Sequence, residues 1–233
     1  MPKTEALDFM GSWRSAIILF AKAPVPGAVK TRLIPAIGKH NAAALYAAMV
    51  THGVALAAQN ANYHVQLWCT PDTTHPLFNN LRKIYPLTLH VQKGHDLGQR
   101  MQYAFEKTLK EFDAALIVGT DCPTITVELL DQAFQALYKD KDAVIAPAVD
   151  GGYVLLGLKK VSAELFTRIA WGTDQVFAQT QQRLNRLPLT WQSLDTQWDV
   201  DRPEDLQRLA REKFRNTWHP DLRDVVENLQ LNL

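Results

Sequence analysis

The strongest constraint on the fold is an alternation of short apolar runs with longer helical patterns along most of the chain. Buried strands are predicted at residues 15–20, 65–69, 87–91, 114–118, 142–146 and 154–158, with a candidate at 188–194. Helical patterns lie between them, at residues 40–58, 99–112, 127–137, 162–169, 173–185 and 203–214. Such alternation is typical of a mainly parallel sheet covered on both faces. We therefore predict a three-layer α/β/α fold.

The domain organisation is predicted to be simple. No internal repeat, low-complexity segment or interdomain linker interrupts the pattern. The prediction is one domain over residues 1–233, with an N-terminal arm at 1–14 and a C-terminal tail at 215–233. The tail carries an amphipathic stretch, Leu222 to Leu229, which could pack on the domain or on a partner.

Composition excludes several classes of protein. The net charge is +1 and no block of Lys and Arg exceeds two residues, so we expect no nucleic-acid surface. The two cysteines, Cys69 and Cys122, are far apart and argue for a reducing compartment. Neither a signal-peptide core nor a run long enough for a membrane span is present. We expect a cytoplasmic protein.

One carboxylate occupies a position that often binds ligands. The apolar run Ala114 to Val118 stops at Gly119 and Thr120 and delivers Asp121, and Pro123 prevents a central strand from continuing. Ligands of open α/β sheets bind outside the carboxyl ends of the strands. Asp121 is thus a candidate ligand of a metal or of a phosphate-bearing molecule, although a plain turn residue is an equal alternative.

Clustered cations follow the first strand. The segment Ala21 to Leu33 contains two prolines and a glycine, which keep it irregular, and three cations, Lys22, Lys30 and Arg32. Cations on a stiff loop suit a polyphosphate. The alternative is a solvated basic loop.

Other polar turns each have a structural explanation. Gln92 to Arg100 can be an ordinary strand-to-helix turn, and Asp150-Gly-Gly can be a hairpin turn unless it faces Asp121. Trp171 can be core packing or a wall of a sugar or base pocket, and Thr173 is a fair helix cap with Asp174 in the first turn. A capping box with Glu204 explains Asp201 completely, whereas Asp199 has no such explanation.

A metal site is consistent with these residues. Mg²⁺ or Mn²⁺ is usually held by one or two carboxylates together with substrate phosphates, and Asp121 with Asp199 or Asp201 could supply that pair. No Walker loop, dinucleotide-binding glycine motif or nucleophile elbow is present. ATPases, kinases, NAD-dependent dehydrogenases and serine hydrolases are therefore disfavoured.

Six motifs in one order carry a resemblance to a known family. They begin at Ala21 (AKAPVPGAVKTRL), Asp96 (DLGQRM), Gly119 (GTDCP), Asp150 (DGGY), Trp171 (WGTD) and Asp199 (DVDRPEDL). Together they resemble the DUF2064 family of bacterial glycosyltransferase-like proteins, some of which are assigned to arsenosugar biosynthesis. The resemblance covers Ile17 to Leu206. That family is similar to the nucleotide-diphospho-sugar transferase (GT-A) superfamily and to small nucleotidyltransferases.

The resemblance implies a Rossmann-like GT-A sheet with a nucleotide over its N-terminal half. Asp121 takes the place of the metal-binding Asp of the GT-A Asp-x-Asp motif, of which only one carboxylate is present. Asp201, with Asp199 as the other candidate, would complete the site for Mg²⁺ or Mn²⁺. The implied nucleotide-binding residues lie in the first loop and in the next two motifs: Ala21, Lys22, Pro24, Gly27, Lys30, Arg32, Asp96, Gly98, Arg100 and Thr120.

The function that follows is a metal-dependent glycosyltransferase acting on a nucleoside-diphosphate sugar and a small-molecule acceptor. Asp150 or Asp174 is the candidate acceptor-side base. The acceptor or sugar pocket would contain Gly151, Gly152, Tyr153, Trp171 and Thr173. A nucleotidyltransferase that releases pyrophosphate is the runner-up, and a nucleotide-binding relative without activity is a third hypothesis. The sequence leaves a homodimer open.

Overall fold

The computed structural model describes residues 14–212 and 215–229, so the predicted arm lies outside the described residues except for Arg14. Seven strands of the described chain form one sheet in the order β3-β2-β1-β4-β6-β5-β7. They are β1 (Ser15–Lys22), β2 (Tyr63–Thr70), β3 (Leu87–Val91), β4 (Ala114–Gly119), β5 (Ala143–Pro147), β6 (Tyr153–Leu158) and β7 (Trp191–Ser193). Neighbouring strands are parallel except around β6, which runs antiparallel to both β4 and β5. The mainly parallel sheet is confirmed.

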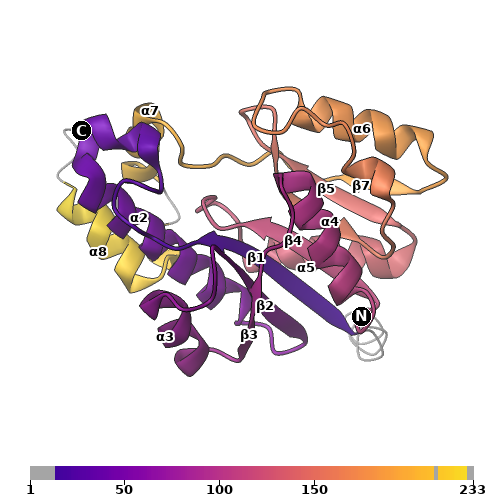
Figure 1. The fold of residues 1–233 in the computed structure, drawn as a ribbon, viewed down its shortest axis with the longest axis horizontal. Coiled ribbons are helices and arrows are strands. Elements are labelled where there is room, and N and C mark those ends of the chain that lie inside the picture. The colour runs from indigo at the N-terminus through magenta and orange to yellow at the C-terminus, as the bar shows by residue number, and fades with distance from the viewer. Residues whose placement is uncertain (1–13, 213–214, 230–233) are drawn as a thin grey trace, which may run out of the picture.

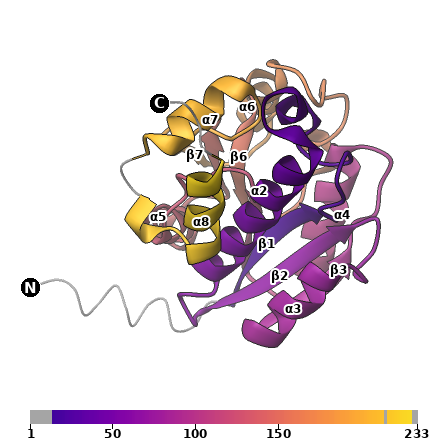
Figure 2. The same cartoon turned by 90° about the vertical axis from the view of Figure 1, so that its left-hand side faces the viewer.

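Helices cover both faces of this sheet (Figure 1). On one face a large core joins the strands to α2 (Ile34–Ala57), α3 (Pro76–Ile84), α5 (Val127–Lys139), α7 (Pro203–Ala210) and α8 (Pro220–Asn228). On the other face a smaller core joins them to α4 (Leu97–Thr108) and α6 (Val176–Arg186). The view in Figure 2 shows α2 and α8 lying side by side in front of the sheet. The predicted three-layer α/β/α fold is confirmed.

Local sequence explains where the central elements begin and end. The five apolar residues before Gly119 in β4 are buried, as a strand covered on both faces requires. Thr126 then caps α5 by accepting a hydrogen bond from the Leu129 amide, as the sequence predicts. Asp96 caps α4 in the same way through the Gln99 amide. Caps and chain breaks therefore fix the strand-to-helix turns.

Several predicted boundaries were wrong. Helix α2 begins six residues earlier than the predicted start at 40 and is kinked at Gly38, whose φ of 77° leaves the helical region. Helix α6 begins at Val176 behind the cap residue Gln175, so Thr173 does not cap it. The predicted helix over 162–169 is only a 3₁₀ turn, Ala163–Leu165.

The predicted capping box at Asp201 was also wrong. The cap residue of α7 is Arg202, and its partner three residues later is Asp205 rather than Glu204. One oxygen of Asp205 accepts hydrogen bonds from the amides of both Asp201 and Arg202, at 3.0 and 2.7 Å. The side chain of Asp201 is consequently released from a capping role.

The C-terminal segment packs against α2. Helix α8 buries Leu222 and Val226 in the larger core, and Trp218 just before it is also buried. The Trp218 indole donates a hydrogen bond to the Pro123 carbonyl at 3.2 Å. Of the two expected outcomes for the tail, packing on the domain is the one observed. No helix in residues 14–212 and 215–229 is long and apolar enough to cross a membrane.

Candidate functional site

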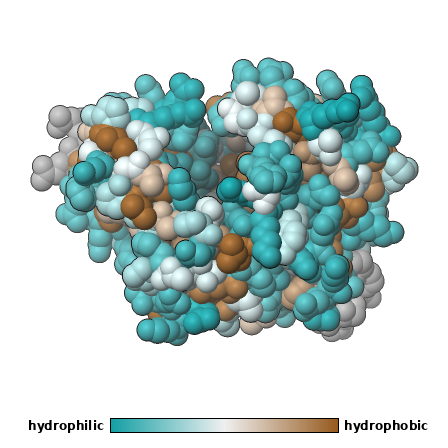
Figure 3. All heavy atoms as spheres, in the orientation of Figure 1, coloured by the Kyte–Doolittle hydropathy of each residue, from teal (hydrophilic) through white to brown (hydrophobic). Residues whose placement is uncertain are grey.

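The loops that carry the sequence motifs follow the carboxyl ends of the parallel strands. Residues 23–33 follow β1, residues 92–96 follow β3, and residues 120–126 follow β4. The segment 194–202 then crosses the molecule from β7 to α7 (Figure 1). In the same orientation, the molecular surface is hollowed between the half with α2 and α7 and the half with α6 (Figure 3).

Asp121 lies two residues beyond β4 and meets a lysine from the first loop. The Lys30 Nζ is 2.9 Å from Asp121 Oδ2, and only 6% of the Lys30 side chain is exposed to solvent. Burial alone would raise the pKa of Asp121, but the Lys30 ammonium outweighs it and holds that pKa below its usual value. Asp121 is therefore held as an ionised carboxylate just beyond the strand end, the position that the sequence indicates.

Asp201 joins this pair from a distant part of the chain. Its Oδ1 lies 3.7 Å from Lys30 Nζ, and its Oδ2 accepts a hydrogen bond from the exposed Arg32 guanidinium. The Val200 amide donates to the Asp121 carbonyl at 2.9 Å, which ties the two carboxylate-bearing segments together. Two carboxylates and two cations thus form one cluster, which we call the Lys30 cluster: Lys30, Arg32, Asp121 and Asp201.

Lys30 is held in an unusual backbone conformation. Its φ and ψ are 44° and 45°, in the left-handed region that residues other than glycine seldom adopt. Burial works against its charge, but Asp121, with Asp201 and Asp199 behind it, outweighs burial and raises the pKa of Lys30. A buried, charged lysine in a strained loop is typical of a functional position.

Asp199 is half-buried beside the cluster. Burial, together with the negative charges of Asp121 and Asp150, raises its pKa to about 6 against the opposing effect of Lys30. This influence of Asp150 places the turn after β5 within electrostatic range of Asp199. Whether Asp150 faces Asp121, the condition for its functional role, stays a prediction. The sequence motifs at 119, 150 and 199 therefore converge.

The donor set fits a hard divalent cation only in part. Carboxylate oxygens suit Mg²⁺ and Mn²⁺, and Mg²⁺ commonly takes one or two carboxylates and completes its shell with phosphate oxygens and water. Asp121 and Asp201 match that pattern. Among the described residues, however, no group of three or more His, Cys, Asp or Glu side chains is arranged to hold a metal. The residues therefore fit a metal that arrives with a phosphate ligand.

The other candidate nucleotide-binding residues have mainly structural contacts. Lys22 Nζ donates to the Ala28 carbonyl at 2.8 Å, and Arg100 Nε donates to the Gly94 carbonyl at 3.1 Å. Thr120 Oγ1 donates to the Phe20 carbonyl at 3.0 Å, and Asp96 is the cap of α4. The rest shape their loops: Ala21 and Gly98 are buried, Pro24 is half-buried, and Gly27 has a φ of 87°.

The candidate acceptor side consists of two loops packed against each other. A side chain on Gly151, whose φ is 90°, would collide with the backbone of Asp174, and the Gly151 carbonyl accepts from the Phe177 amide. Asp150 accepts a hydrogen bond from the Gly152 amide at 2.9 Å. Asp174 is exposed and accepts from the Gln175 side chain. Only Asp150 of these two acids influences the charge of Asp199.

The aromatic residues on this side make packing contacts. Trp171 stands edge-on to Tyr153, with ring centroids 6.5 Å apart, and closes directly over Gly98. The hydroxyl of Tyr153 donates to Met101 Sδ at 3.8 Å. Thr173 Oγ1 donates to the Ala170 carbonyl at 2.8 Å, which stabilises its own turn. The position of Trp171 thus explains why residue 98 is glycine, since any larger residue there would overlap the indole.

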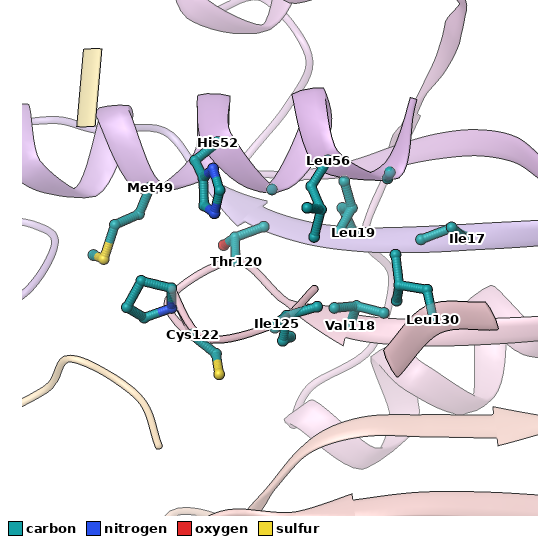
Figure 4. Close-up of a pocket in the computed structure, with 14 residues that line it drawn as sticks. Ile17, Leu19, Met49, His52, Leu56, Val118, Thr120, Cys122, Ile125 and Leu130 are labelled. Atoms are coloured by element: carbon teal, nitrogen blue, oxygen red, sulfur yellow. The ribbon is translucent and has the colours of Figure 1, made fainter. Parts of the chain in front are cut away.

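Sequence reasoning missed three residues that support the site. The Tyr46 hydroxyl in α2 accepts a hydrogen bond from the Lys22 amide at 2.9 Å, and Trp218 holds Pro123 behind Asp121. His52 points from α2 toward the loop with Thr120 (Figure 4), at a cavity of about 10 Å³, enough for about one water molecule. Both Tyr46 and His52 lie on the buried side of α2, where polar groups are uncommon, and that is the signal the sequence carries for them.

Comparisons with known proteins agree on a fold type. The model of DUF2064, a family of uncharacterised proteins conserved in bacteria, matches residues 53–173. No curated protein matches the chain. A crystal structure of a candidate nucleotide-diphospho-sugar transferase from Desulfovibrio desulfuricans G20 is 29% identical, with a TM-score of 0.82 over 93% of this chain and 98% of that one.

Two more distant structures share the fold alone. A cytidylyltransferase from Leptospira borgpetersenii serovar Hardjo-bovis (strain JB197) is 14% identical, with a TM-score of 0.57 over 93% of this chain and 94% of that one. A glucosyl-3-phosphoglycerate synthase from Mycobacterium tuberculosis, in complex with Mn²⁺, UDP-glucose and phosphoglyceric acid, is 10% identical. Its TM-score is 0.53 over 88% of this chain and 78% of that one. The predicted nucleotide-diphospho-sugar transferase type of fold is confirmed.

Proposed function

Because the chain belongs to the DUF2064 family of bacterial proteins, we propose that it is a metal-dependent transferase that moves a glycosyl group from a nucleoside-diphosphate sugar to a small-molecule acceptor. The observation that carries this proposal is the Lys30 cluster, in which Asp121 and Asp201 meet Lys30 and Arg32 at the carboxyl ends of the strands. Two carboxylates and two cations are what a diphosphate and its metal require.

In this proposal the chain binds the two phosphates through the first loop. Lys30 and Arg32 would contact phosphate oxygens, while Asp121 and Asp201 would hold Mg²⁺ or Mn²⁺. The metal, when bound, neutralises the charge that develops on the leaving nucleoside diphosphate. The hydrogen bond from Val200 to Asp121 keeps the two carboxylates at a fixed separation while this happens.

Asp150 is the better of the two candidate bases. A base must reach the acceptor hydroxyl beside the reacting sugar. Asp150 influences Asp199 electrostatically and so lies near the proposed donor site, whereas the exposed Asp174 carboxylate accepts a hydrogen bond from its neighbour Gln175. The short Gly151–Gly152 turn holds Asp150 there through the hydrogen bond from the Gly152 amide.

Nucleotidyl transfer is the second candidate function. The cytidylyltransferase from Leptospira shares the fold over nearly the whole length of both chains. The same cluster would then bind the triphosphate of an NTP and stabilise pyrophosphate as the leaving group. The first loop argues against this, because it lacks the glycine-rich pattern of many nucleotidyltransferases.

A thermal-shift series tests the donor class. Purified protein is heated with single nucleotides and sugar nucleotides, each with and without Mn²⁺. A ligand that binds only the native state raises the apparent Tm by mass action. We expect the largest metal-dependent shift with a UDP- or GDP-sugar, and loss of that shift in Asp121→Asn. Asp140→Asn removes a surface carboxylate paired only with its neighbour Lys141, so it is the matched control and should keep the shift.

Product analysis then separates the two chemistries. Pyrophosphate released from an NTP and a phosphorylated acceptor would replace the glycosyl-transfer proposal by nucleotidyl transfer. No metal-dependent shift with any sugar nucleotide or NTP would contradict both functions, whereas a shift without any product would support a nucleotide-binding relative without activity. We also propose that the chain works as a single domain in the cytoplasm, where its two free, buried cysteines would stay reduced.

A further inference from the structure

The position of Lys30 has a consequence for the order in which ligands bind. Its ammonium lies between the two proposed metal ligands, 2.9 Å from Asp121 and 3.7 Å from Asp201. The second oxygen of Asp201 is taken by Arg32. We propose that Lys30 is an internal cation that blocks the metal site until a diphosphate draws it away, so that metal and nucleotide bind cooperatively.

Charge balance is the first argument. Within the Lys30 cluster two carboxylates face two cations, so the cluster is neutral without any ligand. A divalent ion held by both carboxylates would sit about 2 Å from their oxygens. It would then be very close to the Lys30 ammonium, and their repulsion in this shielded site would be severe. The metal alone must therefore displace Lys30 from both carboxylates. Of its described acidic neighbours only the half-buried Asp199 then remains, so the ammonium needs another anionic partner.

A diphosphate offers that partner. Its oxygens accept charge-assisted hydrogen bonds from both Lys30 and Arg32, and its own charge exceeds that of either carboxylate. Arg32 is 61% exposed and free to reorient, and Lys30 has a long, flexible side chain on a loop. Once both cations turn to the phosphates, Asp121 and Asp201 regain free oxygens for the metal. Phosphate oxygens can then complete its coordination shell.

Cooperativity of this kind is reciprocal. If the diphosphate increases metal affinity by some factor, the metal increases diphosphate affinity by the same factor. This inference rests on the proposed function only for the choice of a nucleoside diphosphate as the anion. The blocking of the metal site by Lys30 is testable with the metal alone.

The experiment measures Mn²⁺ binding by the loss of the free-ion signal in electron paramagnetic resonance. Wild type, Lys30→Met and Lys22→Met are titrated without nucleotide and again with UDP or GDP. Lys22 is the last residue of β1, next to that loop, and its ammonium donates to the Ala28 carbonyl rather than to either carboxylate, so it controls for the loss of one charge. We expect Lys30→Met to bind Mn²⁺ alone about tenfold more tightly than wild type or Lys22→Met.

The titrations with nucleotide test whether a diphosphate removes the block. UDP or GDP should increase the Mn²⁺ affinity of wild type about tenfold or more and that of Lys30→Met much less. Arg32→Met is a second variant whose side chain is mostly exposed, so it should fold even if Lys30→Met does not. It frees one oxygen of Asp201 and should raise metal-only affinity by a smaller factor.

Two results would overturn the proposal: tight Mn²⁺ binding by wild type alone, or unchanged metal-only affinity in both Lys30→Met and Arg32→Met. A different result would overturn only the proposed function. If neither diphosphate binds wild type but Lys30→Met still gains affinity for Mn²⁺, Lys30 blocks a metal site whose partner is another anion.

Discussion

At the scale of single residues, His52 is a base that the fold keeps uncharged. It is 5% exposed, its Nδ1 accepts the His219 amide at 3.3 Å, and its Nε2 has no hydrogen-bond partner in the described chain. Burial, with a smaller contribution from His219, lowers the pKa of His52 from 6.5 to about 4. Protonation therefore favours the unfolded chain.

Acid should consequently destabilise the protein through His52. At pH above 6.5 neither state binds the proton, and the full stability is present. As pH falls from 6.5 toward 4, only the unfolded chain is protonated, so stability is lost, by up to about 3 kcal/mol. In urea unfolding at pH 7 and pH 4.5, His52→Leu should lose less stability than wild type. An equal loss in both would remove His52 as the cause.

Two helical glycines should respond oppositely to alanine. Gly98→Ala places a methyl group inside the Trp171 indole, so we expect a loss of about 1–3 kcal/mol. Gly53 lies inside α2, and a methyl group there meets nothing closer than 3.9 Å. Gly53→Ala should therefore gain up to about 1 kcal/mol from helix propensity. Denaturant midpoints compare them, and a stabilising Gly98→Ala would contradict the packing of Trp171.

At the scale of elements, the segment before α8 supports the loop that bears Asp121. Trp218→Phe keeps most of the buried ring but leaves the Pro123 carbonyl without its donor. We expect a loss of about 1–3 kcal/mol in urea unfolding, together with weaker metal-dependent nucleotide binding. Trp191→Phe is the control, since that indole donates to exposed Asn185 at the far edge of the sheet. If Trp218→Phe and Trp191→Phe weakened nucleotide binding equally, Trp218 would have no specific role in the site.

The sheet was predictable from sequence because each strand is a short apolar run bounded by turn residues or helix caps. Residues 114–118 are continuously apolar and flanked by polar residues, and Thr126 caps the next helix as its position suggests. Predicted helix boundaries were wrong where two neighbouring side chains could fill the same capping position. Both Glu204 and Asp205 could close a capping box, and the choice of Arg202 as the cap residue makes Asp205 the partner three residues later. The apolar run of β6 does not indicate its direction, but the possible hairpin turn at Asp150-Gly-Gly agrees with its antiparallel pairing to β5.

The sequence predicted which residues form the candidate site better than it predicted how they are arranged. Motif order placed Lys30, Asp121 and Asp201 in one proposed site, and the structure does bring them together. No spacing rule could show that Lys30 lies between the carboxylates, because 91 residues separate it from Asp121. Roles of Asp150 and Asp174 in catalysis stay predictions. The contact of Trp218 could not be predicted, because its indole donates to a single backbone carbonyl, that of Pro123.

At the scale of the whole molecule, the C-terminal segment completes the larger core. Trp218, Leu222 and Val226 are each at most 3% exposed, and α8 covers α2. A chain ending at residue 212 would expose that apolar surface of α2 to water. We expect a lower Tm and aggregation, measured by thermal unfolding and light scattering. A truncated chain as stable as the full one would show that α8 is dispensable.

The pairing of β1 with β4 has a consequence for how the protein folds. Ser15 lies opposite Ala114, so the centre of the sheet closes only after a loop of about one hundred residues has been ordered. Pairing of β5 with β6 needs only a short turn and can form early. Asp121 follows the late strand, and Asp150 lies in the early turn. Partly folded chains would therefore form the turn that bears Asp150 before the Lys30 cluster is assembled.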